Sequence, residues 1–126
     1  MTVQEQEAAS QEPVVVCFEG ELDAGDPGCE DELQSIVAAG ARNVVVDMSQ
    51  VSFIDSSIVR ALLLAHRAVD ESGGWLRLVY THHMVRRVID ICGLGDVLPQ
   101  YSSVESARRG ARATPPAALF EREGRT

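Results

Sequence analysis

The chain has 126 residues, of which 45% are hydrophobic and 5% aromatic, and a formal net charge of −8. This length suits one compact domain with an aliphatic core, and no apolar run approaches the roughly 20 residues that a membrane-spanning helix needs. We therefore expect no membrane location. Such an acidic chain also lacks the clustered basic residues that bind phosphate backbones, so we expect no direct nucleic acid binding.

The polar ends of the chain mark the limits of the predicted domain. Residues 1–12 are acidic and glutamine-rich without a hydrophobic period, which is typical of a flexible leader. They lack the basic start and apolar stretch of a secretory signal, and this predicts a cytoplasmic protein. Residues 110–126 combine prolines and mixed charge without a sustained period, so we interpret them as a tail. The ordered domain is expected over 13–109.

Strand and helix signals alternate in the first part of the domain. Residues 14–20 are β-branched and apolar and end at Gly20, which predicts a strand followed by a turn. Asp26 and Pro27 then form a helix-start signal. The helix is expected to end at Gly40 and to bury one apolar stripe, made of Cys29, Leu33, Ile36 and Val37.

The middle of the chain predicts a central strand and a long helix. Residues 43–49 form a continuous apolar run, typical of a strand covered on both faces, and 51–55 alternate as a further strand segment. A helix then runs from the Asp55-Ser56-Ser57 junction to about Ser72. Its core face carries Ile58, Leu62, Ala65 and Val69, and its opposite face carries Arg60, Leu64, Arg67 and Glu71.

The last part of the domain repeats the alternation. Residues 75–80 predict a strand, and a helix capped by Thr81 and stopped by Gly93 follows, with a stripe of Val85, Val88, Ile89 and Cys92. Residues 96–101 are read as a short strand or extended segment and 103–109 as a final helical turn or two. This order predicts an α/β domain with a partly parallel sheet.

Neither metal nor cofactor is expected. The three cysteines, Cys17, Cys29 and Cys92, have no metal-ligand spacing and are interpreted as buried small hydrophobic residues. His82 and His83 lie about 13–15 Å before Cys92 along a helix, too far to share an ion. Neither a glycine-rich dinucleotide motif nor a P-loop lysine motif occurs, so nucleotide binding is not expected either.

Two interpretations of the Asp55-Ser56-Ser57 junction follow from its place at the start of a helix. The residues can simply cap the helix, or a serine hydroxyl there can accept a phosphate, which adds charge without unfolding the domain. A serine hydrolase is not predicted, because His66 lies nine or ten residues along the same helix and no G-x-S-x-G pattern occurs. We therefore predict that the protein is not an enzyme.

Several segments in order resemble the STAS domain of bacterial anti-sigma factor antagonists. They are GELD at 20–23, VVVDMSQVSFIDSS at 44–57, AHRAVDESGGWLRLV at 65–79 and VRRVIDICGLGDVLPQYSSVESA at 85–107. The resemblance implies a small mixed sheet flanked by helices. It also implies partner switching in transcription regulation and stress response, in which the unphosphorylated antagonist binds an anti-sigma factor that is also a serine kinase. Phosphorylation ends the binding, and a serine phosphatase reverses it.

The same resemblance assigns the site residues. It implies phosphorylation at Ser56 and partner contact by Asp23, whose alternative role is only to make a turn. Asp55 and Ser57 flank Ser56 and are expected in the partner surface. Arg60 and the exposed Leu64 are expected to extend it, although a single exposed leucine is also ordinary.

The chain departs from the family pattern directly after the two serines. Ile58, Val59 and Arg60 stand where the family usually has glycine, a leucine or methionine, and often another glycine. Ile58 either narrows access to Ser56 or points into the core. The departure favours an alternative function, a STAS adaptor that is never phosphorylated and binds another protein or a small ligand.

Overall fold

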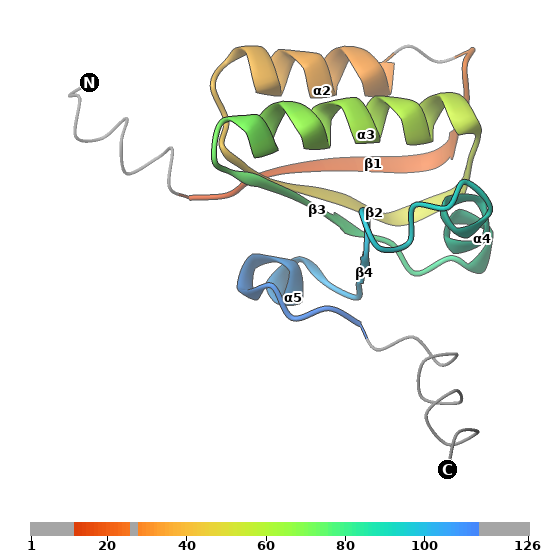
Figure 1. The fold of residues 1–126 in the computed structure, drawn as a ribbon. Helices are drawn as coiled ribbons and strands as arrows, with labels where there is room; N and C mark the ends of the chain where they lie inside the picture. Colours follow the sequence, from red (N-terminus) through yellow and green to blue (C-terminus); the bar gives the residue numbers. More distant parts are fainter. Residues whose placement is uncertain (1–11, 26–27, 114–126) are drawn as a thin grey trace.

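A four-stranded sheet with helices on both faces forms the body of the molecule in the computed structural model (Figure 1). The structure describes residues 12–25 and 28–113. The elements, in chain order, are β1 (Val14–Leu22), α2 (Gly28–Ala38), β2 (Asn43–Ile54), α3 (Ser56–Glu71), β3 (Trp75–Val79), α4 (His83–Ile91), β4 (Gln100–Tyr101) and α5 (Val104–Arg109). The predicted α/β class is confirmed.

The strands follow one another across the sheet in the order β1-β2-β3-β4, and every described pairing is parallel. Parallel neighbours need a crossover segment, and α2 and α3 make two of these crossovers over the same face (Figure 1). All four strands therefore end at one edge of the sheet. The connections that leave this edge begin α2, α3, α4 and α5.

The central position predicted for residues 43–49 is confirmed, because β2 pairs with both β1 and β3. The two predicted segments, 43–49 and 51–55, form one continuous strand of 12 residues. Its pairing with β1 is irregular between Cys17 and Glu19 and again between Gly20 and Glu21. Such irregularities bend a strand, and here they lie in the part of β1 that leads into the loop with Asp23.

Two hydrophobic cores lie on the two sides of β2. Val44, Val46 and Met48 belong to the larger core with the apolar faces of α2, α3 and α4. Val45 belongs to a smaller core with Val79, Tyr101 and Ala107, beneath α5. Burial on both faces is the reason why β2 reads as a continuous apolar run.

The predicted core stripes of the long helices are confirmed. Ile58, Leu62, Ala65 and Val69 of α3 are buried, while Arg60, Leu64, Arg67 and Glu71 are exposed. On α2 the predicted stripe is buried at Cys29 and Leu33 and partly buried at Ile36 and Val37. The predicted start signal at Asp26 and Pro27 lies outside the described residues.

Two sequence predictions are wrong. The N-cap of α4 is His82, whose Nδ1 accepts from the Met84 amide at 3.1 Å, and not Thr81. An imidazole nitrogen accepts the hydrogen bond that we expected a hydroxyl to accept.

The second wrong prediction is that all three cysteines are buried. Only Cys29 is buried. Cys17 and Cys92 are exposed, because Cys17 lies at the edge strand β1 and Cys92 follows the last turn of α4.

The ends of the described chain remain attached to the domain. Gly110 caps α5 with a positive φ of 74°, and the Ala113 amide donates to the Gln100 carbonyl at 2.9 Å. Most of the predicted leader and most of the predicted tail lie outside the described residues. Within 12–25 and 28–113, no helix is both long and apolar enough to cross a membrane.

Candidate functional site

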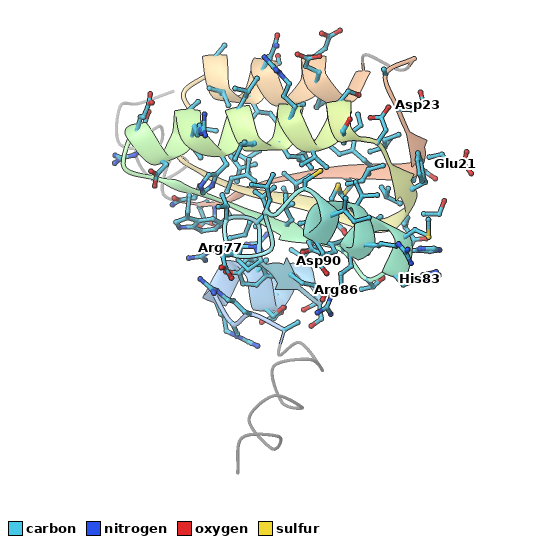
Figure 2. The ribbon with its side chains drawn as sticks, turned by 45° about the vertical axis from the view of Figure 1, so that its right-hand side comes forward. Glu21, Asp23, Arg77, His83, Arg86 and Asp90 are labelled. Carbon is cyan, nitrogen blue, oxygen red and sulfur yellow. The ribbon has the colours of Figure 1, made fainter. Side chains whose placement is uncertain are left out.

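The candidate site lies at the edge of the sheet where the parallel strands end. The loop after β1 carries Asp23, the β2–α3 junction carries Asp55, Ser56 and Ser57, and α4 begins at His83. Figure 2 shows Glu21 and Asp23 pointing outward at this end of the molecule, with His83 at the same end below them. Connections that leave the carboxyl ends of parallel strands commonly form the functional surface of α/β domains.

Asp55 organises the junction through both of its carboxylate oxygens. Oδ1 accepts from the Ile58 amide at 3.1 Å, which makes Asp55 the N-cap of α3, and from the Ser57 hydroxyl at 2.6 Å. Oδ2 accepts from the Ala24 amide at 3.0 Å. The hydrogen bond from the Ser57 hydroxyl is the largest effect on the pKa of Asp55 and lowers it below its ordinary value. Desolvation is the next largest and opposes it, and the bonds from the backbone amides lower the pKa further. Asp55 is therefore a carboxylate at neutral pH.

Asp23 shapes the loop that Asp55 binds. Its Oδ1 accepts from the Gly25 amide at 2.9 Å, so Asp23 does make a turn. A methyl group in place of the Gly25 hydrogen would lie 3.2 Å from this oxygen, which is tight. The Ala24 amide lies inside the same turn and donates to Asp55, so the turn places the exposed Asp23 beside the start of α3.

Ser56 is the first residue of α3 and is exposed. Ser57 is exposed too, but its hydroxyl already donates to Asp55. Ile58 is only 3% exposed and belongs to the larger core. Of the two orientations considered for Ile58, the structure has the one that points into the core and leaves Ser56 uncovered.

The predicted site residues form one group of four and an extension along α3. Asp23, Asp55, Ser56 and Ser57 lie together at the strand ends. Arg60 follows on the outer face of α3, and Leu64, one turn later, keeps 46% of its surface exposed. Nothing in the described contacts ties Arg60 or Leu64 to the four.

The backbone groups that hold this site together were not predictable from the sequence. The Ala24 and Gly25 amides both donate to aspartates, and an amide N–H has no signature in the sequence. The contact between the rings of His82 and His83, which stack with their centroids 4.8 Å apart, was not predicted either. Among the described residues, no group of three or more His, Cys, Asp and Glu has the geometry to hold a metal ion.

Comparisons with known proteins show that the resemblance to STAS domains covers most of the chain. The STAS domain family model matches residues 2–107. Over 109 residues the chain is 30% identical to the anti-sigma-F factor antagonist RsfA of Mycobacterium tuberculosis, a match that covers 84% of this chain and 82% of that protein.

Solved structures agree with the sequence match. An anti-sigma factor antagonist from Mycobacterium paratuberculosis superposes with a TM-score of 0.71 at 26% identity, covering 81% of this chain and 87% of that one. The antagonist SpoIIAA in its unphosphorylated form superposes with a TM-score of 0.61 at 26% identity, covering 90% of each chain. A phosphorylated form of SpoIIAA from Bacillus superposes with a TM-score of 0.57. This chain therefore belongs to the STAS domain family, among its anti-sigma factor antagonists.

Proposed function

We propose that this protein is an anti-sigma factor antagonist whose binding is controlled by phosphorylation of Ser56. In the unphosphorylated state it binds an anti-sigma factor through Asp23, Asp55, Ser57, Arg60 and Leu64 around that serine. The anti-sigma factor is also the kinase, a serine phosphatase restores the binding state, and the exchange takes place in the cytoplasm. The protein itself catalyses no reaction in this scheme.

The observation that carries the proposal is the setting of Ser56, an exposed hydroxyl at the first position of a helix. It directly follows Asp55, whose carboxylate is bonded to the turn that Asp23 makes. A phosphate there adds about −1.5 to −2 charges. Asp55 already accepts from the Ile58 amide, so a phosphate finds that helix-end donor taken and meets the negative charges of Asp55 and Asp23. The surface would change its charge while the buried core stays as it is.

The solved relatives support the same scheme. SpoIIAA is described in both an unphosphorylated and a phosphorylated form, and this chain superposes on both. A member of the same family is therefore phosphorylated without losing the fold.

The first experiment is phosphosite mapping by mass spectrometry on the protein isolated from its host, in growth and under several stresses. Phosphate on Ser56 whose occupancy changes with condition is the expected result. Phosphate confined to other residues, or none in any condition, would contradict the proposal. Purified anti-sigma factors of the host, each tested for binding to the unmodified chain, identify the partner.

A second candidate function rests on the residues that replace the family's glycines. Ile58 and Val59 are buried, so of these three residues only Arg60 adds an exposed side chain to the first turn of α3 beside the serines. A kinase that needs close backbone approach would be hindered here. An adaptor that is never phosphorylated would bind its protein or small ligand equally well as Ser56→Ala and as wild type, and would carry no phosphate in the host.

A further inference from the structure

A groove runs between the two helices that cover the upper face of the sheet. α2 and α3 lie side by side there (Figure 1), and the groove holds about 210 Å³. Most of its lining is apolar and comes from both helices, namely Leu33, Val37, Ala61, Leu64, Ala65 and Ala68, and α2 adds the polar side chain of Gln34. Three of the four α3 residues that line the groove are alanines, whose side chains are short. The fourth, Leu64, is apolar and yet 46% exposed. Leu33, Ala61 and Ala65 are buried, whereas Val37 and Ala68 are partly exposed. Exposed apolar side chains that gather around a hollow mark binding sites.

The groove continues the surface proposed to bind the anti-sigma factor. Ser57, Ala61, Leu64 and Ala68 follow the spacing of one helix face, so the row starts at the phosphorylation junction and enters the groove one turn later. From Ala61 to Ala68 the row is about 10 Å long, because a helix rises about 1.5 Å per residue. This length accommodates about two turns of a guest helix.

The two rims of the groove carry opposite charge. On α2, Glu30 lines the groove and the exposed Asp31 follows it. On α3, Arg60 and Arg67 stand one turn before and after Leu64, and both are exposed. Among the described residues neither arginine has an acidic group within ion-pair distance, so both charges are available to a partner. A guest helix would meet acids on one side and bases on the other.

We infer that the groove receives an amphipathic helix of the anti-sigma factor. Two or three apolar side chains of that helix, spaced along one face, fill the space between Leu33, Val37 and Leu64. Basic residues on one flank lie toward Glu30, and acidic residues on the other flank lie toward Arg60 and Arg67. The opposite rims fix the direction in which the guest helix lies. This inference rests on the proposed function and adds a second contact region beyond the reach of phospho-Ser56.

The test compares exposed apolar residues inside and outside the groove in the full chain. Leu64→Gln removes the apolar wall at a position that is already half exposed, and Ile91→Gln is the matched control, since Ile91 is 73% exposed on α4. Binding to the anti-sigma factor that recognises the wild-type chain is measured by calorimetry. We expect Leu64→Gln to weaken binding about tenfold, as truncation of an interface anchor does, and Ile91→Gln to leave it unchanged.

A second variant tests the charged rims. Glu30→Arg puts a basic side chain on the acidic α2 rim, and it is expected to weaken binding more at low salt than at high salt, because charges near an exposed interface are screened. Thermal unfolding of each variant confirms that the fold is retained before the affinities are compared.

The outcomes separate the groove from the proposed function. If the wild-type chain binds an anti-sigma factor and Leu64→Gln binds it equally well, the groove inference is wrong and Leu64 leaves the proposed binding surface, while control of binding through Ser56 stands. If no anti-sigma factor of the host binds the wild-type chain, both fail. If the wild-type chain sediments as a dimer that Leu64→Gln dissociates, a second copy occupies the groove, and the inference is overturned.

Discussion

The amide of Ala24 donates a hydrogen bond of 3.0 Å to Oδ2 of Asp55, 31 residues further along the chain. This bond joins the turn made by Asp23 to the start of α3, which carries Ser56. The other oxygen of the same carboxylate caps that helix. One side chain thus sets both the helix start and the position of the neighbouring loop.

Asp55→Asn separates these two roles. An asparagine side chain has a single oxygen acceptor, so the variant can keep the cap or the bond to Ala24, and not both. Because asparagine is a good N-cap, we expect the helix start to persist and the Ala24 amide to lose its protection against hydrogen exchange. Exchange measured by NMR at Ala24 and Ile58 checks this, and continued protection of both amides would contradict it.

Asp55→Ala removes both roles and should lower the free energy of unfolding by about 1–2 kcal/mol, the usual effect of losing an N-cap. Urea unfolding measures it. Ser103→Ala is the control, because Ser103 caps α5 by accepting from the Ser106 amide at 3.1 Å. Its loss should lower the free energy of unfolding but leave the Ala24 amide protected against hydrogen exchange.

The hydrogen bonds to Asp55 also predict a pH dependence. They lower the pKa of Asp55 in the folded state below its ordinary value of 3.8. A group with a lowered folded pKa stabilises the fold fully above its unfolded pKa, and this stabilisation is lost as the pH falls through the folded value. The stability difference between wild type and Asp55→Ala should therefore be constant near neutral pH and shrink below about pH 4. Urea unfolding of both proteins from pH 7 to pH 3 tests this, and a difference that grows on acidification would refute it.

The spacing of apolar residues predicted most of the fold, because burial in the core determines both this spacing and the type of each helix or strand. The bounds of α3 and its buried and exposed faces follow from its apolar spacing, and β2 is apolar throughout because both of its faces are covered. The site was only partly predictable. The resemblance selects Ser56 and Asp23, but the contacts that bring their loops together are made by backbone amides. The cap of α4 was missed because histidine is not a usual N-cap.

Substitutions of Ser56 test the effect of charge on binding. Ser56→Ala should bind the anti-sigma factor as the wild type does and accept no phosphate, whereas Ser56→Asp should bind about tenfold more weakly through repulsion in the interface. Calorimetry gives both affinities. Ser72→Asp adds the same charge at the other end of α3 and should have no effect. Equal affinities of the Ala and Asp variants at position 56 would rule out a charge switch.

Asp23→Asn isolates the charge of Asp23 from its turn. The amide oxygen of asparagine still accepts from the Gly25 amide, so the loop should keep its shape. We expect unchanged thermal stability and affinity for the anti-sigma factor lowered by about three- to tenfold, corresponding to the loss of one charged contact. Asp70→Asn, an exposed neutralisation on the last turns of α3, is the control. Unchanged affinity of Asp23→Asn would leave Asp23 with its turn role alone.

Arg77 is expected to hold α5 against the sheet. Its guanidinium lies 3.8 Å from the centre of the Trp75 ring, and Nη1 donates to the Ala107 carbonyl of α5 at 2.9 Å. Arg77→Met keeps much of the stem but loses the stacked cation and its hydrogen bond, so the free energy of unfolding should fall by about 2 kcal/mol. Hydrogen exchange should quicken at the Ala107 and Ala111 amides, which close the first and the last turn of α5, before it changes at α3. Arg87→Met, an exposed substitution on α4, should alter neither quantity. Because α5 lies on the face of the sheet opposite α2 and α3, Arg77→Met should also leave the affinity for the anti-sigma factor unchanged.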